Sequence, residues 1–171
     1  MRTRTTQKQK PKPTALEKAV TILAMQEQSS AKLREKLRQR DYTPEEIDAA
    51  IARLVERHYL NDEESCARQY QKLYEESGMS VRQIEQKLLT RGFPSSLVRA
   101  SAPKDDEKNE RELNAALRSL RSRFRTAAPR AKMKQFLYRR GFSYGICDSA
   151  TSAFLEEHPE YLLKENESYD E

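Results

Sequence analysis

The sequence predicts an all-α protein of three tandem three-helix repeats, which together form an elongated, curved, solenoid-like molecule. One short phrase occurs three times, as RQRDYTPEEI (38–47), TRGFPSSLV (90–98) and YRRGFSYGI (138–146). Its aromatic residues Tyr42, Phe93 and Phe142 are 51 and 49 residues apart, a period typical of helical solenoid units. Apolar residues recur at helical spacing, and no strand-like alternation is visible. Because charged residues (35%) nearly equal apolar ones (36%), thin separate cores are expected rather than one deep core.

Each copy of the phrase is interpreted as a tight corner between two helices. Gly92 and Gly141 can adopt the left-handed conformation that closes a helix, and Asp41 takes that position in the first copy. Thr43, Pro44 and Glu46 then form a capping box for the following helix, and Pro94 and Ser143 begin weaker versions. The helix before each corner carries an apolar i, i+4 pair: Leu33/Leu37, Ile84/Leu88 and Met133/Leu137.

One further helix is expected upstream of each corner. Its apolar face is predicted to be Leu16, Val20 and Leu23 in the first repeat; Cys66, Tyr70 and Leu73 in the second; Leu113, Ala116, Leu117, Leu120 and Phe124 in the third. The resulting organisation is a basic arm (1–13), three repeats (14–60, 61–103 and 104–156) and an acidic tail (157–171). Both terminal segments are expected to be mobile when unbound, because they are charge-biased and lack apolar periodicity.

The sequence contains no pattern that indicates catalysis or a cofactor. His58 and His158 are far apart, and no phosphate-binding glycine loop, catalytic triad or zinc motif is present. We therefore predict a protein that is not an enzyme and has no cofactor or metal. No apolar run is long enough to span a bilayer, and Cys66 and Cys147 are expected to be buried, reduced thiols. A monomeric cytoplasmic protein is the expectation.

Charge is unevenly distributed along the chain. Between Leu113 and Cys147 there are nine Lys and Arg residues and no Asp or Glu. This asymmetry indicates a polyanionic partner or an acidic protein surface, although a solvated helix face would look the same. The predicted contact residues are Arg40, Arg91 and Arg140, which recur at one corner position, together with Arg121, Arg123, Arg125, Arg130, Lys132, Lys134 and Arg139.

The recurring arginines and the aromatic residues of the third corner each have two possible roles, one in binding and one in the structure of the corner. The three recurring arginines present a spaced basic ladder, or else they bind the C-terminal carbonyls of their own helices. Tyr138, Phe142 and Tyr144 alternate with arginines at the third corner, and such rings either stack on bases or form the core of the corner.

The order and spacing of the three corners, with HYLND (58–62) after the first and FLYRRGFSYGI (136–146) near the end, resemble the RecX family of bacterial recombination regulators. The resemblance covers about residues 14–155. It implies a protein that binds the RecA recombinase on single-stranded DNA and restrains filament growth, ATP hydrolysis, strand exchange and co-protease activity.

Two other functions are compatible with the pattern. One is an independent DNA-binding module in which a corner acts as a helix-turn-helix, although no helix carries an obvious set of base-reading side chains. The other is an adaptor solenoid with a purely structural role, which explains the repeats but not the uneven charge.

Overall fold

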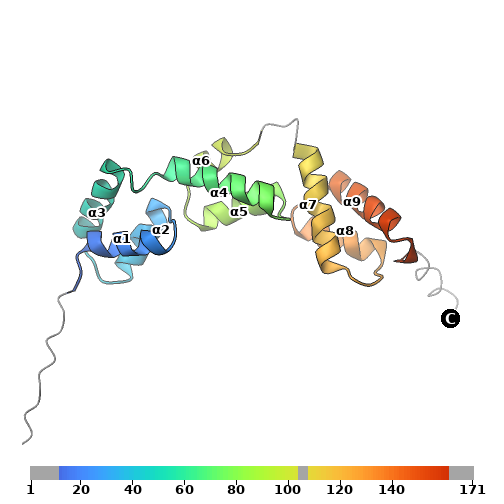
Figure 1. The fold of residues 1–171 in the computed structure, drawn as a ribbon, viewed down its shortest axis with the longest axis horizontal. Helices are drawn as coiled ribbons and strands as arrows, with labels where there is room; N and C mark the ends of the chain where they lie inside the picture. The colour runs from blue at the N-terminus through green and yellow to red at the C-terminus, as the bar shows by residue number, and fades with distance from the viewer. Residues whose placement is uncertain (1–11, 104–107, 162–171) are drawn as a thin grey trace, which may run out of the picture. The chain divides into compact units, whose positions relative to one another are not determined.

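The computed structural model describes residues 12–103 and 108–161, and its regular structure there is entirely helical, without strands (Figure 1). The all-α prediction is confirmed. The helices are α1 (Ala15–Met25), α2 (Ser30–Arg38), α3 (Pro44–Glu56), α4 (Asp62–Glu76), α5 (Val81–Thr90), α6 (Ser95–Ala100), α7 (Lys108–Arg123), α8 (Arg130–Arg139) and α9 (Tyr144–Glu157), followed by the single-turn 3-10 helix η2 (Pro159–Tyr161).

The helices pack in threes, and the chain divides into two compact units, residues 1–61 and 62–171. In the first unit, α1, α2 and α3 enclose a core that includes Leu33, Leu37 and Leu54. The second unit contains two cores: α4 to α6 pack around Tyr70, Ile84, Leu88 and Phe93, and α7 to α9 pack around Leu120, Met133, Leu137, Phe142 and Phe154. Each three-helix repeat therefore has its own small core, as the composition predicted.

The three corners share one hydrogen-bonding pattern. The N–H of Phe93 donates to the carbonyl of Leu88 (3.2 Å), and the N–H of Gly92 donates to that of Leu89 (2.9 Å). This pair of bonds defines a Schellman end, and it recurs at the other two corners with Leu37 and Leu137 as the acceptors of the longer bond. The closing residues Asp41, Gly92 and Gly141 have φ values of 59°, 86° and 84°, as predicted.

The side-chain caps predicted at Thr43 and Ser143 are confirmed, and α5 begins in a similar way. Thr43 and Glu46 form a capping box at α3, and Ser80 and Gln83 form another at α5. Ser143 caps α9 by accepting a hydrogen bond from the N–H of Ile146. Each of these bonds satisfies an N–H that has no partner inside its helix, so the phrase builds both sides of the corner.

Gly141 and Gly145 provide a matched test of the third corner. A Cβ at Gly141 would lie 3.1 Å from both the Arg82 Cβ and the Ser80 Oγ, at a φ that L side chains rarely adopt, whereas a Cβ at Gly145 would meet nothing within 4 Å. Gly141→Ala is expected to lower the free energy of unfolding by about 1–3 kcal/mol. Gly145→Ala, within α9, is expected to raise it by up to about 1 kcal/mol. Urea unfolding of both variants measures this, and an equal loss in both would contradict the role of Gly141.

The apolar face predicted for α1 is wrong at one position, Val20, whereas Leu16 and Leu23 are partly buried and pack against the core. The buried residues of α1 are Ala15, Ala19 and Ile22, whereas Val20 is 48% exposed. Ala15, Ala19 and Ile22 recur at four- and three-residue spacing, so they form the buried stripe of the helix, and Val20 lies outside that stripe. The faces predicted for α4 and α7 agree with the structure, with Cys66, Tyr70, Leu117 and Leu120 all buried.

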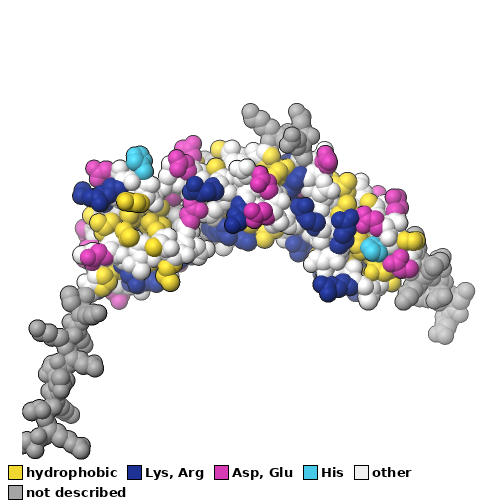
Figure 2. Space-filling model, viewed as in Figure 1, with side chains coloured by type: hydrophobic (Ala, Val, Ile, Leu, Met, Phe, Trp, Pro, Cys, Tyr) yellow, Lys and Arg dark blue, Asp and Glu magenta, His cyan; other side chains and the backbone are white. Residues whose placement is uncertain are grey.

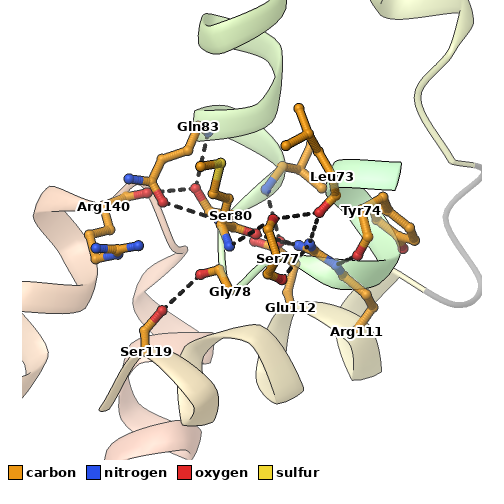
Figure 3. Close-up of polar contacts among 12 residues, drawn as sticks. Leu73, Tyr74, Ser77, Gly78, Ser80, Gln83, Arg111, Glu112, Ser119 and Arg140 are labelled. Atoms are coloured by element: carbon orange, nitrogen blue, oxygen red, sulfur yellow. Dashed lines mark hydrogen bonds and ion pairs between the residues drawn. The ribbon is translucent and has the colours of Figure 1, made fainter. Parts of the chain in front are cut away.

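Two adjacent side chains of α7 join the second and third repeats (Figure 3). The Arg111 guanidinium donates to the carbonyls of Tyr74 (2.8 Å) and Met79 (2.5 Å) and pairs with Glu112 (3.0 Å). Glu112 accepts the N–H of Val81 (2.9 Å) at the start of α5. The cation thus lies at the C-terminal end of α4 and the anion at the N-terminal end of α5, where each suits the local helix dipole.

Three further contacts reinforce this joint. The Ser119 hydroxyl donates to the carbonyl of Gly78 (2.8 Å), and the Ser80 hydroxyl donates to the carbonyl of Arg140 (2.5 Å). The Arg111 guanidinium also lies over the Tyr74 ring, 4.4 Å from its centroid. Burial lowers the pKa of Arg111, and the neighbouring Glu112 opposes that shift.

The termini fall mostly outside the described residues, and so does the mobility predicted for 1–13 and 157–171. Within the described part, α9 extends to Glu157 and Tyr161 packs against Phe154, with ring centroids 6.0 Å apart. The packed body therefore continues past residue 156, where the third repeat was predicted to end.

Candidate functional site

Some of the basic residues predicted as contacts already pair with acids or polar groups of the chain, which we call engaged, and others do not. Arg121 forms a bidentate pair with Glu157, at 3.1 Å from Nε and 2.6 Å from Nη2. Arg130 contacts Asp148 (3.4 Å) and the Ser152 hydroxyl (2.5 Å), and Lys134 pairs with the same Asp148. These acids belong to α9, beyond or at the edge of the acid-free stretch, so α9 neutralises part of the basic surface of α7 and α8.

The pKa shifts follow this pairing. Hydrogen bonding to Lys134 lowers the pKa of Asp148, and Arg130 adds to the effect. Hydrogen bonding to Arg121 lowers the pKa of Glu157. Both acids are therefore held in the charged form that offsets the nearby cations.

The recurring arginines have three different roles. Arg40 donates to the carbonyl of Lys36 (2.6 Å) in its own helix, which is the structural alternative noted for this residue. Arg91 donates to the Gln69 side chain (2.6 Å) on α4. Arg140 is half-buried and lies over the Phe136 ring, 5.3 Å from its centroid. Their shared sequence position therefore does not produce a shared set of contacts.

Four of the predicted cations are exposed and have no hydrogen bond or ion pair within residues 12–103 and 108–161. They are Arg123 at the end of α7, Arg125 in the α7–α8 loop, Lys132 in the first turn of α8 and Arg139 at the end of α8. Lys and Arg side chains are visible along the second unit in Figure 2. We call Arg123, Arg125, Lys132 and Arg139 the open cations, and they are the side chains best placed to meet an anionic partner.

The three aromatic residues of the third corner, Tyr138, Phe142 and Tyr144, also fall into two groups, one buried and one exposed. Phe142 is 2% exposed and belongs to the core, as one alternative predicted. Tyr138 and Tyr144 are 67% and 74% exposed, so they lie outside that core.

The first unit carries an apolar groove that the sequence analysis missed. A cavity of about 350 Å³ is lined by Val20, Leu23, Ala24, Leu54 and Tyr59, and yellow apolar side chains are grouped on this unit in Figure 2. The sequence of α1 could have indicated this groove, because the helix contains more aliphatic residues than one buried face needs. The groove differs in chemistry from the basic surface of the third repeat.

Other kinds of site find little support in the described residues. No group of His, Cys, Asp and Glu there is arranged to hold a metal ion. Cys66 and Cys147 are buried free thiols, as predicted, and burial raises the pKa of both. None of the described helices combines the length and apolar character needed to cross a membrane.

Tandem three-helix units with separate cores and a basic third repeat define a class of all-α helical-repeat proteins. Two family models match within the chain: the first three-helix domain of RecX at residues 15–54 and the third three-helix domain of RecX at residues 110–151.

Individual relatives agree with these matches. The chain is 28% identical over 130 residues to "Regulatory protein RecX" of Trichlorobacter lovleyi, covering 72% of this chain and 84% of that protein. It is 31% identical over 88 residues to "Regulatory protein RecX" of Haemophilus ducreyi, covering 52% of this chain and 58% of that protein.

The crystal structure of RecX from Lactobacillus salivarius shares the fold, with a TM-score of 0.66, 19% identity, and coverage of 82% of this chain and 94% of that one. The chain belongs to the RecX family of regulatory proteins.

Proposed function

We propose that this chain binds the RecA filament on single-stranded DNA and restrains filament growth, ATP hydrolysis, strand exchange and co-protease activity. Membership of the RecX family supports the proposal most strongly. The open cations of the third repeat support it on physical grounds, because a RecA filament presents DNA phosphates and acidic side chains. We propose further that the protein acts as a monomer in the cytoplasm.

Binding alone is sufficient for this activity, so no residue of the chain needs a catalytic role. The Arg111 joint holds the second and third repeats together, and the core of α7 to α9 fixes the helices that carry the open cations. A surface ordered before binding loses less conformational entropy when it meets its partner. A bound chain then resists the addition or rearrangement of filament subunits.

The ATPase of RecA on single-stranded DNA tests the proposal directly. Sub-stoichiometric amounts of the protein are expected to lower the steady-state rate, because one bound chain affects several neighbouring subunits. No inhibition at any ratio, combined with tight binding to naked duplex DNA, would support the helix-turn-helix module instead.

A further inference from the structure

The third corner differs from the other two in the side chains that flank its turn. The positions of Tyr138 and Tyr144 are occupied by Leu89 and Ser95 in the second corner. They are occupied by Arg38 and Pro44 in the first. All three corners nevertheless form the same Schellman end with a buried aromatic residue after it. The corner therefore folds without tyrosines at these positions, and packing does not account for them.

The register of α8 against α9 points to Tyr138 and Tyr144 as facing positions next to the turn. Arg130 contacts Ser152, and one turn further along α8 Lys134 pairs with Asp148, one turn earlier in α9. Four residues further along α8 and four residues earlier in α9, the same register reaches Tyr138 and Tyr144. Both rings are mostly exposed, at 67% and 74%. Within residues 12–103 and 108–161 no ring contact joins the two tyrosines, and most of each side chain is accessible to solvent.

Two cations lie on α8 close to these tyrosines. The Lys134 Nζ lies 5.8 Å from the centroid of the Tyr144 ring. Arg139, which follows Tyr138, is one of the open cations. The nearby acid, Asp148, is already paired with Lys134 and Arg130. Of these two cations, Arg139 has no acidic partner within the described residues. Exposed aromatic faces beside such a cation are the combination that binds single-stranded nucleic acid, because bases stack on the rings while the cation neutralises phosphate charge.

We infer that Tyr138 and Tyr144 form a stacking platform for the unpaired bases of single-stranded nucleic acid, with the open cation Arg139 beside the backbone. The inference deepens the proposed function and rests on it, since it names the part of the DNA that the third repeat holds. Its chemistry concerns bases, so it can be tested on naked single-stranded DNA without recombinase.

A fluorescent reporter tests contact with bases. The chain has no Trp, so Tyr144→Trp introduces a single fluorophore on the platform. Adding oligo-dT is expected to quench its emission, whereas an abasic oligonucleotide of equal length and charge is expected to leave the emission nearly unchanged. Tyr59→Trp, exposed in the first unit, is the matched control and is expected to show no quenching. Equal quenching by both oligonucleotides would overturn the inference.

A substitution pair tests the energetic contribution. Tyr138→Leu with Tyr144→Ser reproduces the residues of the second corner, so the fold is expected to be retained. Affinity for oligo-dT is expected to fall at least about fivefold for each ring that stacks. The slope of log affinity against log salt should stay the same, because no phosphate contact is removed. Phe at both positions is expected to restore binding, since it retains the ring face.

The outcomes separate this inference from the proposed function. If the Leu/Ser variant binds oligo-dT like the unmodified protein, the platform does not bind bases and the inference is overturned, even if RecA inhibition is lost through a protein contact. If the platform binds bases but the unmodified protein does not inhibit the RecA ATPase, the inference holds and the proposed function fails.

Discussion

Reversing Arg123, Arg125 and Lys132 to Glu is expected to abolish most of the inhibition of the RecA ATPase. These three open cations lie around the α7–α8 loop and make no hydrogen bond or ion pair with the described part of the chain. Placing three acids against an anionic filament replaces attraction by repulsion, so the concentration needed for half-maximal inhibition should rise at least about tenfold. Helical content should not change, because exposed charges contribute little to stability.

The choice of residues matters in this experiment. Reversing Arg121 would also place a new acid against Glu157 and break an existing pair, so its effect would combine two causes. The matched control reverses Arg38 and Arg57, two exposed cations of the first unit, and is expected to cost much less inhibition. If the triple variant inhibits as well as the control and the unmodified protein, the basic surface is only a solvated face.

Salt dependence distinguishes contact with DNA from contact with RecA. Each phosphate neutralised on single-stranded DNA contributes about −0.7 to the slope of log affinity against log salt. If the three cations contact phosphates, the triple variant should bind naked DNA with a slope shallower by about 2. An unchanged slope together with lost inhibition would assign these residues to acidic groups of the recombinase.

Arg111→Ala is expected to lower the free energy of unfolding of the second unit by about 3–5 kcal/mol. The side chains of Arg111 and Glu112 are only 11% and 10% exposed. Removing the guanidinium leaves the buried Glu112 carboxylate without its cation and the carbonyls of Tyr74 and Met79 without a donor. Urea unfolding followed by circular dichroism measures the loss.

Arg118→Ala is the matched control for this prediction. Arg118 lies two turns later on α7 and also donates to a carbonyl before α5, that of Ser77 (3.0 Å), but it is exposed. Its loss is expected to cost less than about 1 kcal/mol. The double variant Arg111→Met with Glu112→Gln should recover part of the stability, because no unpaired charge remains buried. Equal effects of Arg111→Ala and Arg118→Ala would show that the joint is not held by the buried pair.

The three corners were predictable from the sequence because the interactions that form them are local. The Schellman bond from Phe93 to Leu88 spans five residues, and the Thr43–Glu46 capping box spans three. Residue type is nearly sufficient at such short range: Gly at positive φ, Ser or Thr at the N-cap and an apolar pair one turn apart. The helix order and the separate cores follow from the same pattern repeated three times.

The sequence could not show which cations have partners and which are open, because their partners are distant along the chain. Arg121 and Glu157 are 36 residues apart, and Arg130 and Asp148 are 18 apart, so only the packing of α9 against α7 and α8 brings them together. The acid-free stretch from 113 to 147 therefore overstated the free charge of the third repeat, because acids outside it neutralise Arg121, Arg130 and Lys134.

The sequence by itself determined the helices, their corners and the location of the basic region, since these depend on neighbours within about one or two helical turns. The tertiary structure decided which face of α1 is buried, which aromatic residues of the third corner are exposed, and which cations have partners. These properties depend on how closely two helices approach and in which register. Ala19, Phe142 and Asp148 acquire their roles only from the helices packed against them.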